Sequence, residues 1–136
     1  MKAWGITDTG LVRRDNQDSF AIASGALEGD VAALVCDGMG GAKSGNIASS
    51  LAVDVFVQEV VRTWSPNMDW DKTDLLLKAA VKLANFTVFD QAQQFEEFDG
   101  MGTTLVAVLI RGRRATVVNV GDSRAYKVDG DGIRQI

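Results

Sequence analysis

Three glycines and an aspartate follow an apolar run in the first third of the chain. The apolar run is 31–36, and Asp37 comes directly after it with Gly38, Gly40 and Gly41. Such a run predicts a buried strand, and the glycines predict an abrupt turn where the strand ends. A carboxylate at that position, beside backbone without side chains, can hold a hard cation and let a phosphate approach closely. An isolated Asp-Gly is usually turn chemistry, but three glycines directly after a buried strand favour a metal site.

Two further aspartates lie at comparable places. Asp18 is at the edge of a predicted strand, and Asp122 follows the apolar run 115–120. Two hard cations need several oxygen ligands, and Asp18, Asp37 and the backbone carbonyl of Gly38 can supply a shared set. The alternative for each aspartate is that it only forms a turn.

Arg13 places a cation just before Asp18. Its guanidinium presents a planar fork of donors that suits a phosphate, and lysine is a poor substitute at such bidentate sites. The alternative is a solvated turn in which the arginine pairs with Asp15 or Asp18. A Gly-Thr-Thr sequence at 102–104 opens a later strand; its threonines can hydrogen-bond near a site, although such a turn is usually only a strand start.

The chain contains no histidine and one cysteine, Cys36. Ser-His-Asp and Cys-His catalysis are therefore excluded within this chain, and a zinc site is disfavoured. Oxygen ligands favour magnesium, manganese or calcium instead. The run 38–44 is not a phosphate-binding P-loop, because that pattern requires glycine at positions 37 and 42. The acidic turn 129–132 is not a calcium loop, because the required glutamate does not follow.

The composition is that of one small globular domain, with 136 residues, 46% hydrophobic and 24% charged. Fourteen basic and 18 acidic residues give a net charge of −4, and no basic stripe is present, so we expect no nucleic-acid partner. No apolar stretch has the length of a membrane span and no signal-peptide core is found, so we expect no membrane partner. A single cysteine fits a reducing compartment, and we expect a cytoplasmic location.

Periodicity predicts the elements that must position these residues. Helical spacing predicts one helix from about Ser44 to the Trp64–Asn67 break and a second from about 71–73 to the Asp99–Gly102 stop. Short apolar runs predict strands at 2–7, 19–24, 31–36, 103–110, 115–120, 124–128 and 133–136, the later ones as an antiparallel meander. Asp129 to Gly132 predicts a hairpin turn. Strands followed by two helices and more strands favour an α+β layered domain over a parallel βαβ fold.

The apolar positions of the second helix predict its buried side. We expect its inner face to carry Leu76, Ala79, Ala80, Leu83, Phe86 and Phe89.

Four motifs together resemble a known family. They are Arg13 with Asn16–Asp18, Asp37–Gly41 with Gly45 and Ala48-Ser49, Gly102–Thr104, and Asn119–Arg124. In order and approximate spacing, from the first residues to the last, they are similar to the metal-dependent Ser/Thr protein phosphatases (the PPM family, bacterial type).

The resemblance implies a four-layer αββα sandwich of two antiparallel sheets flanked by helices, with residues 1–136 as the incomplete N-terminal portion of a single domain. It implies hydrolysis of phosphoserine or phosphothreonine in proteins by a metal-bridged water. The cofactor would be Mn²⁺ or Mg²⁺, with two ions in a complete domain and a third, weaker one.

The resemblance also assigns roles to individual residues. Asp37 would bridge two ions, the Gly38 carbonyl would bind one of them, and Asp18 would hold the site directly or through metal-bound water. Arg13 would grip the substrate phosphate, and Asp122 would belong to the additional metal position.

The chain departs from the family pattern in three respects. Gln17 stands where many relatives carry glutamate, Asn46 replaces a frequent acidic residue, and the family's later metal-binding aspartates are absent from these 136 residues. We therefore expect a truncated portion that binds metal weakly and is inactive or weakly active alone. Unpaired strand edges predict a strand-exchanged dimer.

Two other interpretations remain open at this point. One is a catalytically dead phosphatase-like module that binds and regulates a partner, and the other is a plain structural domain. In the enzyme interpretation, the partners are phosphorylated proteins, the targets of a cognate Ser/Thr kinase.

Overall fold

The computed structural model describes residues 1–40 and 44–136. Gly41, the last glycine of the predicted turn, lies outside these residues. The elements in chain order are β1 (Asp18–Ala23), β2 (Val31–Met39), α1 (Ser44–Thr63), α2 (Trp70–Gln94), the 3-10 helix η1 (Glu96–Phe98), β3 (Gly102–Thr103), β4 (Leu105–Arg111), β5 (Arg114–Val120), β6 (Tyr126–Asp129) and β7 (Gly132–Gln135). The predicted order of strands, two helices and strands is confirmed.

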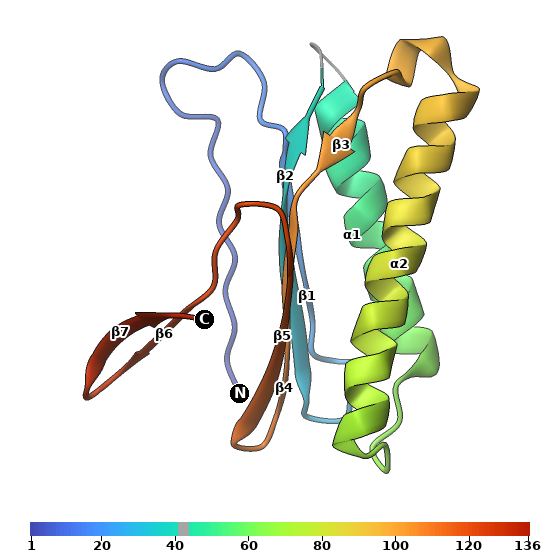
Figure 1. Ribbon diagram of the computed structural model, residues 1–136. Coiled ribbons are helices and arrows are strands. Elements are labelled where there is room, and N and C mark those ends of the chain that lie inside the picture. The colour runs from blue at the N-terminus through green and yellow to red at the C-terminus, as the bar shows by residue number, and fades with distance from the viewer. Residues whose placement is uncertain (41–43) are drawn as a thin grey trace.

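An antiparallel sheet forms the centre of the molecule. Its strands follow the order β1-β2-β4-β5, and the short β3 pairs with the end of β2 beyond β4. Both helices cover one face of this sheet, while the N-terminal segment and the β6–β7 hairpin lie on the other side (Figure 1). The described residues thus supply a helix layer, an antiparallel sheet and the beginning of a further layer.

The alternation of side chains along β2 decides which residues face the helices. Ala32, Leu34 and Cys36 are buried, whereas Val35 and Asp37 are exposed. Because successive side chains of a strand point to opposite faces, Asp37 lies on the face that the helices do not cover.

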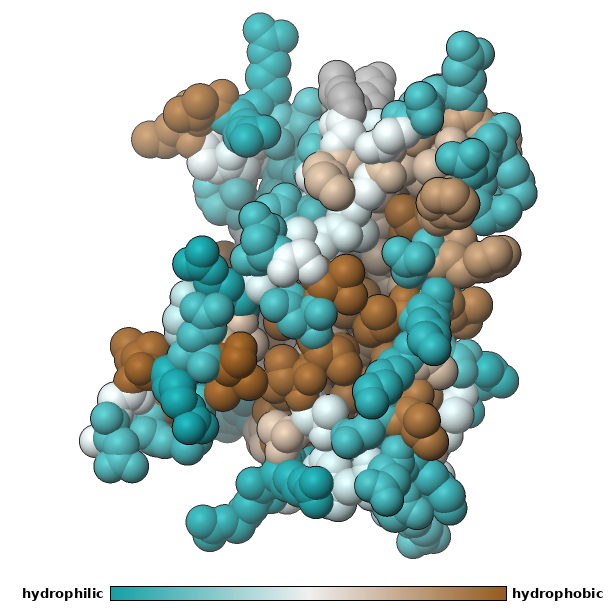
Figure 2. All heavy atoms as spheres, in the orientation of Figure 1, coloured by the Kyte–Doolittle hydropathy of each residue, from teal (hydrophilic) through white to brown (hydrophobic). Residues whose placement is uncertain are grey.

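Between α2 and the edge strand β5, the apolar interior reaches the surface. A hollow of about 190 Å³ opens there, lined mainly by Val81, Val88, Leu105 and Val120. Figure 2 shows brown side chains gathered between these two elements.

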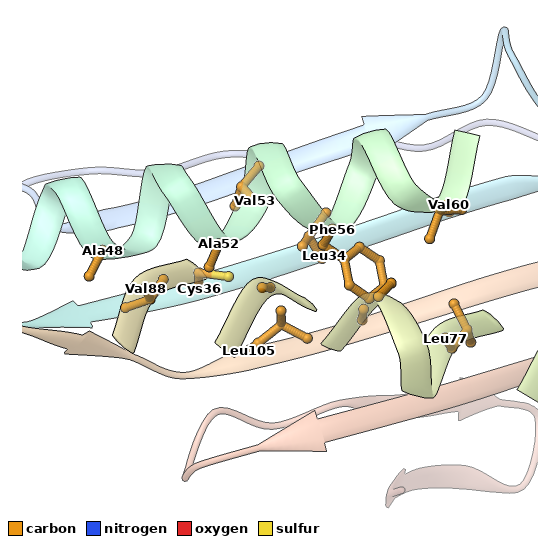
Figure 3. Close-up of a cluster of buried hydrophobic side chains, with 14 of the residues drawn as sticks. Leu34, Cys36, Ala48, Ala52, Val53, Phe56, Val60, Leu77, Val88 and Leu105 are labelled. Carbon is orange, nitrogen blue, oxygen red and sulfur yellow. The ribbon is translucent and has the colours of Figure 1, made fainter. Parts of the chain in front are cut away.

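The core fills the space between the helices and the sheet. Leu34 and Cys36 of β2 pack against Ala52 and Phe56 of α1, and Leu77 of α2 lies within the same cluster (Figure 3). The first helix buries its residues at 48, 52, 56 and 60 against the sheet. This close packing fixes the sheet, and with it the strand ends, as a rigid platform.

The predicted strand 2–7 is wrong. Residues 1–9 have no regular structure and are exposed. The segment crosses the uncovered face of the sheet, where Gly5 lies on the ring of Phe20, so close that a Cβ at Gly5 would be 2.7 Å from Phe20 Cζ. A strand requires a neighbour within hydrogen-bonding distance, and within the described residues none lies beside this segment.

Two predicted strands have different boundaries in the structure, and the predicted meander is shorter. β2 continues past residue 36 through Asp37 to Met39, because Gly38 pairs with Thr103. The predicted strand 103–110 is divided into β3 and β4 at Thr104. The predicted meander ends at β5, since among the described residues β6 and β7 pair with each other and with no further strand, although the hairpin itself and its turn are confirmed.

α2 begins at Trp70 after an Asp69 N-cap, whose carboxylate accepts a hydrogen bond from the Lys72 amide at 2.8 Å. Its predicted inner face is partly wrong. Leu76 and Ala80 are buried as expected, but the rest of the predicted set is exposed. The buried face is instead Thr73, Leu76, Leu77, Ala80, Ala84, Val88 and Ala92.

Arg111 fastens the loop between the helices to the end of the sheet. Its Nε lies 2.6 Å from Asp30 Oδ2, and its Nη2 donates to the Ser65 carbonyl at 3.2 Å. The guanidinium also donates to the Met68 carbonyl and contacts the Trp64 ring. Within the described part of the chain, neither helix has the length and apolar character needed to cross a membrane.

Candidate metal and phosphate site

Two carboxylates lie side by side at one end of the sheet. Asp18 opens β1 and pairs directly with Asp37 of β2 in the antiparallel register. Residues directly opposite each other on neighbouring strands project to the same face, so both carboxylates share the uncovered face of the sheet. This convergence was expected from the sequence, and the register of β1 with β2 produces it.

The backbone of Asp37 is held by two threonines. Its carbonyl oxygen accepts hydrogen bonds from the Thr104 amide at 2.9 Å and from Thr103 Oγ1 at 3.0 Å. Its amide donates to Thr104 Oγ1 at 2.9 Å. The side chain of Asp37 takes no part in these bonds, so the carboxylate is positioned yet available for a ligand.

Gly38 lies where the start of α1 meets β2. A Cβ on Gly38 would overlap the backbone of Gly45 and come within 2.7 Å of the Gln17 carbonyl. The Gly38 amide also donates to that Gln17 carbonyl at 3.1 Å. Only glycine permits this approach, which holds Asp37 against the loop that carries Arg13.

The same loop is tied to α1 through Ser49. This side chain is fully buried, and its Oγ donates to the Gln17 carbonyl at 2.7 Å and lies 3.0 Å from Ser19 Oγ. One residue earlier in the loop, Asn16 accepts from the Asp18 amide at 3.0 Å. These bonds set the start of β1, and therefore the place of the Asp18 carboxylate.

Arg13 shares a cleft with the two carboxylates. A hollow of about 220 Å³ is lined by Arg13, Asp18, Asp37 and Gly38, and a second one of about 370 Å³ adjoins it at the same aspartates. Four of the five residues singled out in the sequence are therefore brought together. Their individual roles stay predictions.

Asp122 is the fifth of these residues and is not among the residues that line either hollow. It lies on the exposed turn after β5. Its neighbour Ser123 does line the larger hollow, and Ser123 Oγ lies 2.6 Å from Thr104 Oγ1. The turn is therefore attached to the threonine that holds Asp37, while its aspartate lies outside the cleft lining.

The two carboxylates repel each other. Partial desolvation of Asp18, followed by the negative charge of Asp37, raises the pKa of the Asp18 carboxyl above its usual value. Within residues 1–40 and 44–136, neither aspartate forms an ion pair with a lysine or arginine. A cation between the two carboxylates would relieve this repulsion.

The residues present fit a hard divalent cation. Two adjacent carboxylates and the backbone carbonyl of Gly38, which lines the same hollow, are oxygen donors of the kind that magnesium and manganese take. Within the described residues, no group of three or more His, Cys, Asp or Glu side chains is placed so that it alone could hold a metal ion. Further ligands would therefore be water or backbone oxygens, or would come from outside these residues.

Sequence reasoning missed two contributors to the cleft, Thr7 and Asp8. Both line the larger hollow, and Thr7 Oγ1 accepts a hydrogen bond from Asn16 Nδ2 at 2.6 Å. Residues 2–7 were expected to form a strand, and no motif marks Thr7 or Asp8. Only the path of residues 1–9 over the sheet brings them to the site.

Comparisons with known proteins agree with this geometry. The family model described as protein phosphatase 2C matches residues 12–136. The chain is 35% identical over 134 residues to the serine/threonine protein phosphatase PstP of Mycobacterium tuberculosis, covering 96% of this chain and 23% of that protein. The crystal structure of serine/threonine phosphatase Stp1 from Staphylococcus aureus superimposes with a TM-score of 0.85 at 34% identity, covering 96% of this chain and 50% of that one.

A further solved structure contains metal. It is the catalytic domain of PstP in complex with two manganese ions, which matches with a TM-score of 0.76 at 32% identity and covers 95% of this chain and 51% of that one. The chain thus spans about half the length of the solved chains it matches. With the family model, the relatives and the fold in agreement, this chain belongs to the protein phosphatase 2C family, the bacterial PPM-type phosphatases.

Proposed function

We propose that this chain supplies the N-terminal half of a catalytic domain that hydrolyses phosphoserine and phosphothreonine in proteins. The observation that carries the proposal is the in-register pair of Asp18 and Asp37, which faces a cleft also lined by Arg13. The relatives named serine/threonine phosphatases support the reaction class.

In this proposal, Asp37, Asp18 and the Gly38 carbonyl hold the divalent cations, Mn²⁺ or Mg²⁺. When bound, such cations lower the pKa of a water molecule and neutralise charge on phosphate oxygens. The chain's own contribution is to position the carboxylates through Thr103 and Thr104, so that little reorganisation is needed during the reaction.

Arg13 has a separate role in the proposal. Its guanidinium lines the same hollow as the carboxylates and would bind two phosphate oxygens at once. A phosphorylated side chain held in this way would have its phosphorus oriented toward the two carboxylates that would hold the cations. Asp122 would contribute to a third, weaker metal position.

Several finer points belong to the same proposal. The 136-residue chain alone would bind metal weakly and have little or no activity, because the relatives' domains are about twice as long. The substrates would be cytoplasmic phosphoproteins, the targets of a cognate Ser/Thr kinase.

The reaction can be tested by replacing the matching half of the PstP catalytic domain with residues 1–136. The expected result is manganese-dependent release of phosphate from a phosphothreonine peptide. Asp37→Asn should abolish this release, and Asp131→Asn, which removes an exposed hairpin carboxylate, should leave it unchanged.

Two results would count against the proposal. Equal turnover by the Asp37→Asn chimera would show that Asp37 is not part of the site. A folded chimera that binds a phosphopeptide but never releases phosphate would instead support the catalytically dead binding module.

A further inference from the structure

The turn that follows β5 reaches the cleft through Ser123 rather than through Asp122. Ser123 is partly buried and lines the larger hollow together with Asp18 and Asp37. Its Oγ lies 2.6 Å from Thr104 Oγ1, which is a hydrogen-bond distance for two hydroxyl groups. Ser123 is therefore placed to act on the residues around Asp37, whatever Asp122 binds.

Thr104 connects this turn to the strand that carries Asp37. Its Oγ1 accepts a hydrogen bond from the Asp37 amide at 2.9 Å, and its own amide donates to the Asp37 carbonyl at 2.9 Å. Three polar groups thus form one chain, from the Asp37 amide to the Thr104 hydroxyl and on to the Ser123 hydroxyl. When the Thr104 hydroxyl donates to Ser123, its oxygen becomes a better acceptor for the Asp37 amide, because hydrogen bonds in a chain polarise one another.

Both branches of the Thr104 side chain are held by the same turn. Thr104 and Gly121 lie just beyond Leu105 and Val120, the pair at the end of the register between β4 and β5. A Cβ on Gly121 would be 2.8 Å from Thr104 Cγ2, and the φ of Gly121 is +97°, a conformation that favours glycine. The methyl group thus lies against the Gly121 backbone while the hydroxyl meets Ser123, so Thr104 is confined to one rotamer.

We propose that Ser123 is a positioning residue for the metal-binding carboxylate of Asp37 and that it acts through Thr104. The inference rests on the proposed function, since it takes Asp37 to hold a cation. A strand residue whose amide and carbonyl are both held has little freedom to rotate, so its side chain points in a defined direction. Ser123 stabilises the rotamer in which Thr104 holds the Asp37 amide. Without the Ser123 hydroxyl, the Asp37 backbone is held less firmly and its carboxylate varies in direction.

Manganese binding by the 136-residue chain tests the proposal with a matched pair of substitutions. Ser123→Thr keeps the hydroxyl, whereas Ser123→Val has the same shape without it. In electron paramagnetic resonance titrations, we expect Ser123→Val to weaken Mn²⁺ binding at least about fivefold and Ser123→Thr to bind within about twofold of the wild type. Ser24→Ala, which removes an exposed hydroxyl after β1, is the control and should bind as the wild type does.

A double-mutant cycle with Thr104→Val separates positioning from direct metal ligation. A serine that acts through Thr104 loses its effect once the Thr104 hydroxyl is gone, so Ser123→Val should weaken Mn²⁺ binding by less than about twofold in the Thr104→Val background. A serine that binds the cation directly would instead give losses that add.

Amide hydrogen exchange of the metal-free chain gives a measurement that does not depend on metal binding. The Asp37 amide should exchange at least about threefold faster in Ser123→Val than in the wild type or Ser123→Thr, because its hydrogen bond to Thr104 opens more often. The Leu34 amide, in the middle of the same strand, should be unchanged. General destabilisation would instead accelerate exchange at both residues.

Four results would overturn the proposal. They are equal Mn²⁺ affinity of Ser123→Val and the wild type, equal losses in the valine and threonine variants, additive losses in the cycle, and an Asp37 amide that exchanges at the wild-type rate in Ser123→Val. If Asp37→Asn weakens binding while Ser123→Val does not, the proposed function stands and the inference about Ser123 alone fails. Unchanged affinity in Asp37→Asn would contradict the proposed function itself, and the role of Ser123 with it.

Discussion

At Asp37, the backbone and the side chain are separated in function. The two threonines bind only the amide and carbonyl of this residue, so the carboxylate projects into the cleft beside Asp18 with no ion-pair partner among the described residues. Two like charges held together cost stability, and a cation bound between them would offset that cost.

Asp37→Asn should therefore change stability in opposite directions with and without metal. The raised pKa of Asp18 means that the charged pair opposes folding, and this opposition is present above that pKa and is relieved as the pH falls through it. At pH 7 without metal, the variant should be more stable by about 0.5 kcal/mol. Thermal denaturation with and without Mn²⁺ checks this, and the added ion should stabilise only the wild-type chain. A variant less stable than the wild type without metal would contradict the account.

Gly38 allows a matched pair of substitutions. Gly38→Ala should destabilise the fold by about 2 to 3 kcal/mol, because the added methyl overlaps the backbone of Gly45. Gly25→Ala is the control, since nothing lies within 4 Å of a Cβ there. Urea denaturation of both variants compares them, and equal stability would show that the strand and α1 do not approach so closely.

Cys36 supplies a prediction for alkaline pH. Burial in β2 raises the pKa of this thiol to about 12, so the unfolded chain ionises well before the folded one. Stability is unaffected below the ordinary thiol pKa of about 8.5 and declines above it. Between pH 8.5 and 10, the wild type should lose about 1.6 kcal/mol relative to Cys36→Ala in urea denaturation. A constant difference across that range would contradict the burial of the thiol.

At the scale of elements, Arg111 joins three parts of the fold. It pairs with Asp30 before β2, hydrogen-bonds carbonyls of the loop between the helices, and lies 5.5 Å from the ring of Trp70 at the start of α2. The pair is only partly exposed, with 18% of the Arg111 side chain and 14% of the Asp30 side chain accessible, so solvent screens it less than a surface pair.

Arg111→Ala should destabilise the fold by about 2 kcal/mol, because it leaves Asp30 and loop carbonyls without a partner. Arg113→Ala, two residues away and exposed, should change stability by less than about 0.5 kcal/mol. Chemical denaturation measures both. Equal effects would mean that the loop does not depend on this guanidinium.

How well the buried face of a helix could be predicted depended on how many apolar faces the helix carries. The 44–63 helix has one apolar face and was predicted correctly. α2 carries two apolar stripes on opposite sides, and the predicted inner face joined residues from both, because periodicity alone does not say which stripe meets the sheet. The N-terminal run failed for a different reason, since strand formation depends on a neighbour that the local sequence does not supply.

At the scale of the whole molecule, the site depends on long-range register. Local sequence indicated Asp18 and Asp37 as strand-end carboxylates, yet only the pairing of β1 with β2 places them directly opposite each other. Thr7 and Asp8 entered the cleft through the path of an irregular segment, which no spacing rule predicts. Asp122 shows the converse, because its motif was clear while its side chain is not among the residues that line the cleft.

The chain matches about half of each of these solved phosphatase chains, so the proposed roles concern that half alone. Its helix layer and sheet form a rigid support, whereas the face that carries the carboxylates is only partly covered, by the N-terminal segment and the β6–β7 hairpin.

Manganese binding tests most directly whether Asp18 and Asp37 together hold the metal. The measurement is an electron paramagnetic resonance titration of the chain with Mn²⁺, compared among the wild type, Asp18→Asn, Asp37→Asn and the exposed control Asp131→Asn. The account predicts that each of the first two substitutions weakens binding at least about tenfold and that the control binds as the wild type does. Equal affinity in all four proteins would contradict it.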